Sequence, residues 1–130
     1  MAIRDRALDA WELALVTTVI HYMNESLVDL DTLGTQDYDF ARQAKHWSEM
    51  KGYGLGLQFS PMRSAGTDSQ RLARHAEISG LIESLGTGPT LEASQREAGR
   101  ARLLDARAAL VDLYDLDPAT AGGDDGFDGW

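Results

Sequence analysis

The chain has 130 residues, and its composition of 43% hydrophobic and 25% charged residues is typical of a single globular domain with a sizeable core. Its net charge of −9 argues against binding to nucleic acid or to an anionic membrane surface, because both need a basic face on the protein. The absence of cysteine excludes disulfides, thiolate nucleophiles, zinc knuckles and iron–sulfur clusters.

The first predicted helix spans about residues 3–30. Apolar side chains recur in it every three or four positions and form an arc wide enough to contact two neighbouring helices. This arc contains Leu8, Trp11, Leu15, Val16, Val19, Ile20, Tyr22, Met23 and Leu27. The opposite face carries Thr17, His21, Asn24 and Glu25. No segment has the ~20 apolar residues of a transmembrane helix, and acidic residues in the first helix interrupt any secretion signal.

A second predicted helix covers about residues 38–59, because Asp37 or Thr35 can cap it and Pro61 must end it. Its apolar arc contains Phe40, Ala44, Trp47, Met50, Leu55, Leu57 and Phe59. Three glycines lie inside this helix, Gly52, Gly54 and Gly56, and each costs a helix about 1 kcal/mol relative to alanine. Their spacing is also found in phosphate-binding loops, but no strand precedes them. We therefore expect close approach of another backbone, or a bend in the helix.

Two further helices are predicted after this one. Asp68 or Thr67 caps a third helix that extends to about residue 85. Its apolar face contains Ile78, Ile82 and Leu85. Thr90 caps a fourth helix, which extends to about residue 116 and ends before Pro118. This helix carries Leu103, Ala106, Leu110 and Leu113 at the spacing of a core face.

Long amphipathic helices joined by short connections predict an all-α fold, an up-down antiparallel four-helix bundle over residues 1–117. Residues 118–130 form an acidic tail rich in glycine and aspartate, which we expect to be disordered unless Phe127 and Trp130 dock. Residues 124–128 offer oxygen ligands at a density found in calcium sites. They lack the length and the terminal glutamate of an EF-hand loop.

The candidate site with the most specific spacing is the pair His46 and Glu49 in the second helix. Two residues three positions apart lie on neighbouring rows of one helical surface, from which both can reach one cation. One interpretation is a divalent metal site for iron, zinc or manganese, and the other is a structural contact between the two side chains. A metal needs further ligands, of which His75 on the third helix is the first candidate, ahead of Glu25, Asp37 and Asp39. For His75 alone, a hydrogen-bonded core histidine is the favoured interpretation, and His21 is expected at the surface.

Hydrolase motifs are absent from the chain. It contains neither the zinc-protease pattern HExxH nor a Gly-x-Ser-x-Gly elbow, and the adjacent side chains of His46 and Ser48 diverge on a helix. A glycosidase would need two paired carboxylates, and no pair stands out. Trp11 and Trp47 are expected to anchor the core, with an aromatic cofactor slot as the alternative.

Four groups of residues carry a family resemblance: Val19–Tyr22, Tyr38–Ala41, Lys45–Gly52 and Leu55–Phe59. Through them the chain resembles, from about residue 11 to residue 114, the C-terminal part of the bacterial family called domain of unknown function 4856. That family is similar to the imelysin-like proteins, which are helical, exported, often lipid-anchored proteins associated with iron acquisition and once described as peptidases. Their signature Gly-x-His-x-x-Glu corresponds here to Ala44, His46 and Glu49, with the glycine replaced.

The resemblance implies a non-enzymatic binding protein of the cell envelope, periplasmic or anchored to the outer membrane. It implies that His46 and Glu49 hold iron or another divalent metal. It also implies that the chain is the C-terminal part of a longer protein and docks to an N-terminal half. The alternative hypothesis is a structural module without a ligand, which self-associates through its glycine-rich stretch or its tail.

Overall fold

The computed structural model describes residues 3–59 and 68–130. Four α-helices dominate it: α1 (Ile3–Thr32), α2 (Phe40–Leu57), α3 (Asp68–Ser84) and α4 (Arg96–Tyr114). Two short 3-10 helices, η1 (Ala93–Gln95) and η2 (Pro118–Thr120), flank α4. Helices make up 75% of the described residues, which contain no strand. The prediction of an all-α fold with four helices is confirmed.

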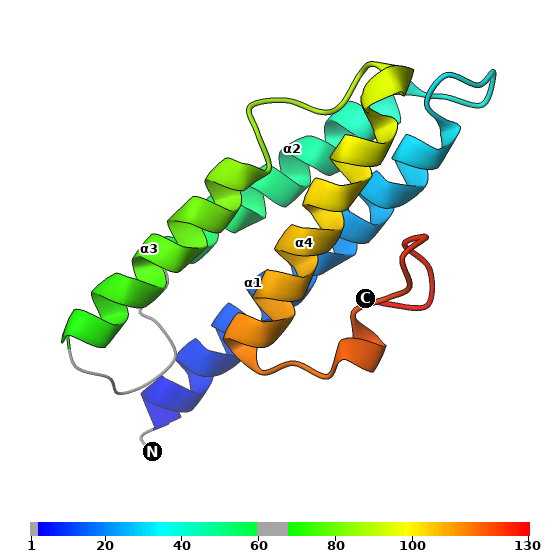
Figure 1. Ribbon diagram of the computed structural model, residues 1–130. Coiled ribbons are helices and arrows are strands. Elements are labelled where there is room, and N and C mark those ends of the chain that lie inside the picture. The colour runs from blue at the N-terminus through cyan, green and yellow to red at the C-terminus, as the bar shows by residue number, and fades with distance from the viewer. Residues whose placement is uncertain (1–2, 60–67) are drawn as a thin grey trace.

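The helices lie side by side around one apolar core (Figure 1). α1 packs against α2 and α4, and α3 packs against the same two helices. The centre of the core consists of fully buried side chains from all four helices. They include Val16, Val19, Ile20, Met23, Leu27, Met50, Leu57, Ile78, Ile82 and Leu110. The predicted apolar arc of the first helix is therefore correct along its middle.

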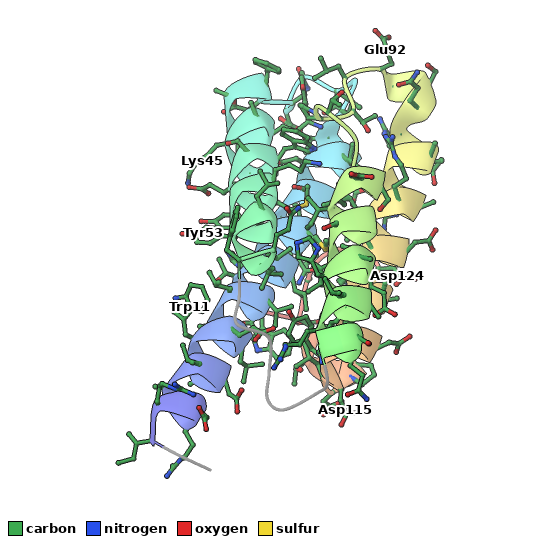
Figure 2. All side chains as sticks on the ribbon, turned by 90° about the vertical axis from the view of Figure 1, so that its left-hand side faces the viewer. Trp11, Lys45, Tyr53, Glu92, Asp115 and Asp124 are labelled. Carbon is green, nitrogen blue, oxygen red and sulfur yellow. The ribbon has the colours of Figure 1, made fainter. Side chains whose placement is uncertain are left out.

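The N-terminal part of α1 departs from the predicted pattern. Trp11 is 48% exposed, so it does not anchor the core. Figure 2 shows it on the part of α1 that extends beyond the last turn of α2, where that neighbour no longer covers it. Asn24, which the sequence places on the polar face, is buried because the C-terminal tail packs over it. The sequence pattern of one helix contains no information about a cover supplied by a distant segment.

The start of α2 is set by a cap that was not predicted from the sequence. Asp39 has an extended backbone, and its side chain accepts hydrogen bonds from the main-chain N–H groups of Ala41 and Arg42. The predicted caps Asp37 and Thr35 are therefore wrong. Three residues of the predicted apolar arc are exposed rather than buried, namely Phe40, Leu55 and Phe59.

Close packing explains one of the three glycines of α2. A Cβ atom at Gly54 would lie 2.4 Å from the Cδ1 atom of Ile82 on α3. At Gly52 and Gly56 a Cβ atom would meet nothing within 4 Å. The expected close approach therefore occurs at Gly54, and it involves a side chain of α3 rather than its backbone.

The fourth helix begins later than predicted. Thr90 caps no helix: its main-chain oxygen accepts a hydrogen bond of 2.9 Å from Gln43, and its hydroxyl accepts one from Arg102. Residues 91–95 form an extended segment and the turn η1 before α4 starts at Arg96. The helix stops at Tyr114 because the next residue, Asp115, has a left-handed backbone with φ 50°. Thr90 thus links α2 to α4.

The C-terminal tail is attached to the helices by polar contacts. The side-chain amide of Asn24 donates to the main-chain oxygens of Ala121, at 2.9 Å, and Trp130, at 3.2 Å. Arg107 on α4 donates to the Asn24 side chain and to the main-chain oxygen of Gly123. The Phe127 side chain stays 56% exposed. Main-chain oxygens of the tail therefore attach it to α1 and α4.

Candidate functional site at the seam of α1 and α2

His46 lies on α2 and faces α1, where it meets two carboxylates. Its Nδ1 atom is 2.8 Å from Oδ2 of Asp29, and its Nε2 atom is 3.7 Å from Oε2 of Glu25. A carboxylate oxygen only accepts hydrogen bonds, so Nδ1 carries a proton that it donates to Asp29. His46 is nearly buried, and Nε2 points toward the more exposed of the two acids.

Asp29 is the centre of this group of side chains. It is 1% exposed, and its second oxygen, Oδ1, accepts a hydrogen bond of 2.7 Å from Nε of Arg42. That hydrogen bond is the largest cause that raises the pKa of Arg42 above its ordinary value. We call Glu25, Asp29, Arg42 and His46 the Asp29 cluster.

Helical spacing explains why these four side chains meet. Glu25 and Asp29 are four residues apart on α1, and Arg42 and His46 are four residues apart on α2. Each pair therefore lies on one face of its helix, and the packing of α1 on α2 brings the two faces together. In the cluster, two acidic residues of α1 therefore face an arginine and a histidine of α2 across the seam.

Glu49 does not complete the cluster. It hydrogen-bonds the side chain of Tyr22 and thereby raises the pKa of that phenol above its ordinary value. Its Oε2 atom is 4.0 Å from Nζ of Lys45 and is buried without a hydrogen-bond partner. The structure thus pairs His46 with α1 carboxylates instead of with Glu49, which corrects the geometry expected from the His-x-x-Glu spacing.

Aromatic rings border the cluster on one side. The ring of Tyr22 lies 6.1 Å from the imidazole of His46 and stacks on the ring of Tyr53, at 5.9 Å and 9°. Figure 2 shows Tyr53 and Lys45 on the outer side of α2. The stack therefore lies beside the imidazole of His46.

The other predicted site residues lie elsewhere. His75 is exposed on α3 although Ile78 and Ile82 of the same helix are buried, so it is not a core histidine. His21 is exposed, as expected. Within residues 3–59 and 68–130, no three histidine, cysteine or acidic side chains are placed to hold one metal ion. Trp47 is half-buried against the core and lines a pocket.

Asp29 was not predicted as a partner of His46, and Glu25 was predicted only as a further ligand behind His75. Both belong to α1, whereas the first predicted partner, Glu49, lies on the same helix as His46. A signal was present, because an acidic pair at positions i and i+4 precedes an Arg–His pair with the same spacing in the next helix. Such matched pairs on consecutive helices indicate a contact across their seam.

Comparison with known proteins adds no relative. No protein-family model matches the chain, and neither a curated protein nor a solved structure matches it. Among the described helices, none has the length and apolar character needed to cross a membrane.

Proposed function

We propose that the protein is a non-enzymatic helical binding protein of the bacterial cell envelope that holds a divalent metal, iron or zinc, at the Asp29 cluster. His46 and Glu25 would be its ligands, in place of the His46–Glu49 pair expected from the sequence. The supporting observation is the 3.7 Å distance between Nε2 of His46 and Oε2 of Glu25. The resemblance to imelysin-like proteins supports the class of ligand and the location.

The ligand geometry agrees with this proposal. Zinc binds imidazole nitrogen and carboxylate oxygen at about 2.0–2.2 Å, which places two ligands of a tetrahedral site about 3.4 Å apart. The Glu25 side chain is 42% exposed, so a small rotation can close the difference from 3.7 Å. Imidazole and carboxylate together suit iron and zinc.

Asp29 would act as the residue that positions His46. A histidine that binds a metal usually donates its other ring N–H to a carboxylate, which fixes the tautomer and the direction of the ring. The hydrogen bond from Nδ1 of His46 to Asp29 has this form. Arg42 places a positive charge on the other side of Asp29, and the proposed site has two protein ligands, His46 and Glu25. We therefore expect a lower metal affinity than that of a closed structural site.

Calorimetric titration with zinc, and anaerobically with ferrous iron, tests the metal site. We expect His46→Ala and Glu25→Gln to weaken binding at least tenfold, and Glu49→Gln to bind as the wild type does. Glu49→Gln is the matched control, because it removes a carboxylate one turn from His46 that contacts Tyr22 instead. Equal metal uptake by all four proteins would contradict the proposal, provided that circular dichroism shows them folded.

We also propose that the helices form an up-down antiparallel bundle over residues 1–117, with residues 118–130 as an acidic tail. The contacts of α1 and α3 with the same two neighbours support this arrangement. A chain that ends at Asp117 should then retain cooperative unfolding. Loss of its helical circular dichroism would refute an independent bundle.

A second candidate function is a self-associating structural module without a ligand. Large apolar side chains on the surface favour it, since Phe59 is 84% and Leu72 is 71% exposed. In this case His46→Ala would change stability but no binding property. Sedimentation would show an oligomer that Leu72→Ser or removal of the tail dissociates, and a wild-type monomer at all concentrations would exclude it.

A further inference from the structure

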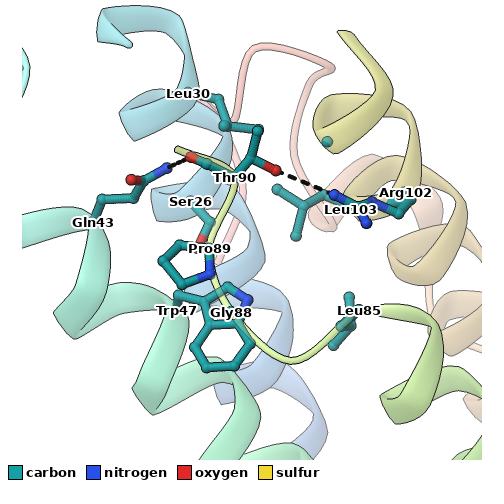
Figure 3. Close-up of a pocket in the computed structure, with 11 residues that line it drawn as sticks. Ser26, Leu30, Gln43, Trp47, Leu85, Gly88, Pro89, Thr90, Arg102 and Leu103 are labelled. Atoms are coloured by element: carbon teal, nitrogen blue, oxygen red, sulfur yellow. Dashed lines mark hydrogen bonds between the residues drawn. The ribbon is translucent and has the colours of Figure 1, made fainter. Parts of the chain in front are cut away.

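An open groove lies where the N-terminal half of α1 runs past the C-terminal end of α4. One face of α1, the residues that follow α4 and the tail residue Trp130 line it, and its volume is about 610 Å³. Sites for small molecules commonly measure about 300–1,000 Å³. The cavity between α1, α2 and α4 is far smaller (Figure 3). Its volume of about 20 Å³ has room for one water beside Ser26, and it adjoins the Asp29 cluster. The groove therefore has the room for a ligand that this cavity lacks.

Much of the wall of this groove is apolar. Ala10, Leu13 and Ala14 recur on one face of α1, and Leu116 and Trp130 line the groove from beyond the end of α4. Ala10 and Ala14 are exposed, and the Trp130 side chain is 36% exposed, so both walls are open to a ligand. The face of an indole ring attracts a cation as well as apolar groups. The groove therefore suits an apolar body and favours a positive charge beside it.

The hydroxyl groups that line the groove are already used as hydrogen-bond donors. Thr17 and Thr120 donate to main-chain oxygens four and three residues earlier, at 3.0 Å and 2.8 Å. Tyr114 donates at 2.8 Å to the side chain of Glu12. An anion needs donors, and it would find these three hydroxyl hydrogens occupied. The hydroxyls of the groove thus do not favour an anionic ligand.

The charged side chains that line the groove, within the described part of the chain, are the carboxylates of Asp115 and Asp117. Both residues are exposed, and Figure 2 shows Asp115 at the end of α4. The last turn of α4 carries no basic residue that would offset the partial negative charge of this helix end. Arg74 of α3 donates to the main-chain oxygen of Leu113, but it does not line the groove. The groove therefore attracts a cation, and it disfavours a second copy of this chain, whose net charge is −9.

We propose that this groove binds an organic cation in which an ammonium group is joined to an apolar body. The apolar body would lie along α1 and Leu116, and the ammonium group would meet Asp115, Asp117 and the ring of Trp130. A primary ammonium group offers three hydrogen-bond donors, and an ionised carboxylate only accepts. Asp117 keeps one oxygen for this contact, because its Oδ1 atom already accepts a hydrogen bond from the main-chain N–H of Ala119.

Calorimetry with three probes of similar length and different charge tests this proposal. The probes are 4-phenylbutylamine, which is cationic at neutral pH, the neutral 4-phenylbutanol and the anionic 4-phenylbutyrate. We expect the wild type to bind the amine at least fivefold more tightly than the alcohol, and the carboxylate more weakly than the alcohol. The double variant Asp115→Asn/Asp117→Asn should lose the preference for the amine. Asparagine suits both positions, because it tolerates the left-handed backbone of residue 115, with φ 50°, and can cap η2 as Asp117 does.

Three further variants separate the groove from other effects. Asp112→Asn removes an exposed carboxylate of α4 that does not line the groove, so it should keep the wild-type preference. Trp130→Ala should weaken the binding of both amine and alcohol, because it removes a wall while the main-chain contacts of residue 130 with Asn24 and Thr120 remain. His46→Ala should leave all three affinities unchanged, so the groove and the metal site can fail separately.

Three calorimetric results would overturn the proposal: no binding of the amine by the wild type, equal affinities for amine and alcohol, or an unchanged preference in the double variant. Sedimentation that shows a dimer dissociated by Trp130→Ala would also overturn it, because a second copy of the chain would then occupy the groove.

Discussion

Replacing Asp29 with asparagine should destabilise the protein by about 2–3 kcal/mol. The buried carboxylate accepts hydrogen bonds of 2.7 Å from Arg42 and 2.8 Å from His46. An asparagine can offer its oxygen to one of these donors but must turn its NH₂ group toward the other. Each hydrogen bond to a charged group contributes about 1.5–3 kcal/mol. Because the Arg42 side chain is 41% exposed and can regain water, the loss should stay below that of a fully buried ion pair.

Urea unfolding at neutral pH measures this loss as a lower transition midpoint with an unchanged slope. Asp31→Asn is the matched control. Asp31 lies on α1, as Asp29 does, and pairs at 2.7 Å with Arg100 of α4. Its side chain is 48% exposed, so we expect a loss below about 1 kcal/mol. If Asp29→Asn and Asp31→Asn lose the same small amount, the Asp29 cluster does not stabilise the seam.

Three further predictions concern residues of α1, α2 and α4. Gly52→Ala should raise the unfolding free energy by about 0.5–1 kcal/mol. Gly54→Ala should not raise it, because a new Cβ would lie 2.4 Å from the core side chain of Ile82. Equal gains for the two variants in urea unfolding would contradict this packing. Tyr114→Phe should cost about 1–3 kcal/mol in the same assay, because its hydroxyl donates 2.8 Å to a buried glutamate, and a smaller change would argue against that bond. The Tyr22 phenol should titrate above its ordinary pKa of 10.0, so the stability from its contact with Glu49 is present below pH 10 and is lost as pH rises through the folded-state pKa. Glu49→Gln should lower that pKa in an ultraviolet titration against Tyr22→Phe, and an unchanged value would refute the contact.

The sequence predicts the helices and the centre of the core well. Apolar periodicity identifies Val16, Ile20 and Leu27 as core residues, because their burial depends on the face of a single helix. It fails for Trp11 and Asn24, whose exposure depends on where the neighbouring elements end. The start of α4 is missed for a similar reason, since Thr90 bonds to Gln43 on another helix instead of capping its own.

The candidate site was only partly predictable. Helical spacing marks His46 as a residue at the edge of the core, and the structure places it there. Its partner could not be chosen from spacing within α2, because the choice between Glu49 and the α1 carboxylates depends on the register of the two helices. That register is set by side-chain packing along the whole seam, including the stacked rings of Tyr22 and Tyr53.

Nitrogen NMR of the imidazole rings during a zinc titration tests the metal site most directly. We expect zinc to shift the resonance of Nε2 of His46, while Nδ1 keeps the proton that it donates to Asp29. The resonances of the exposed rings of His21 and His75 should change little. A shift confined to His21 or His75, or an unchanged His46 at saturating zinc, would show that no metal binds at the seam of α1 and α2.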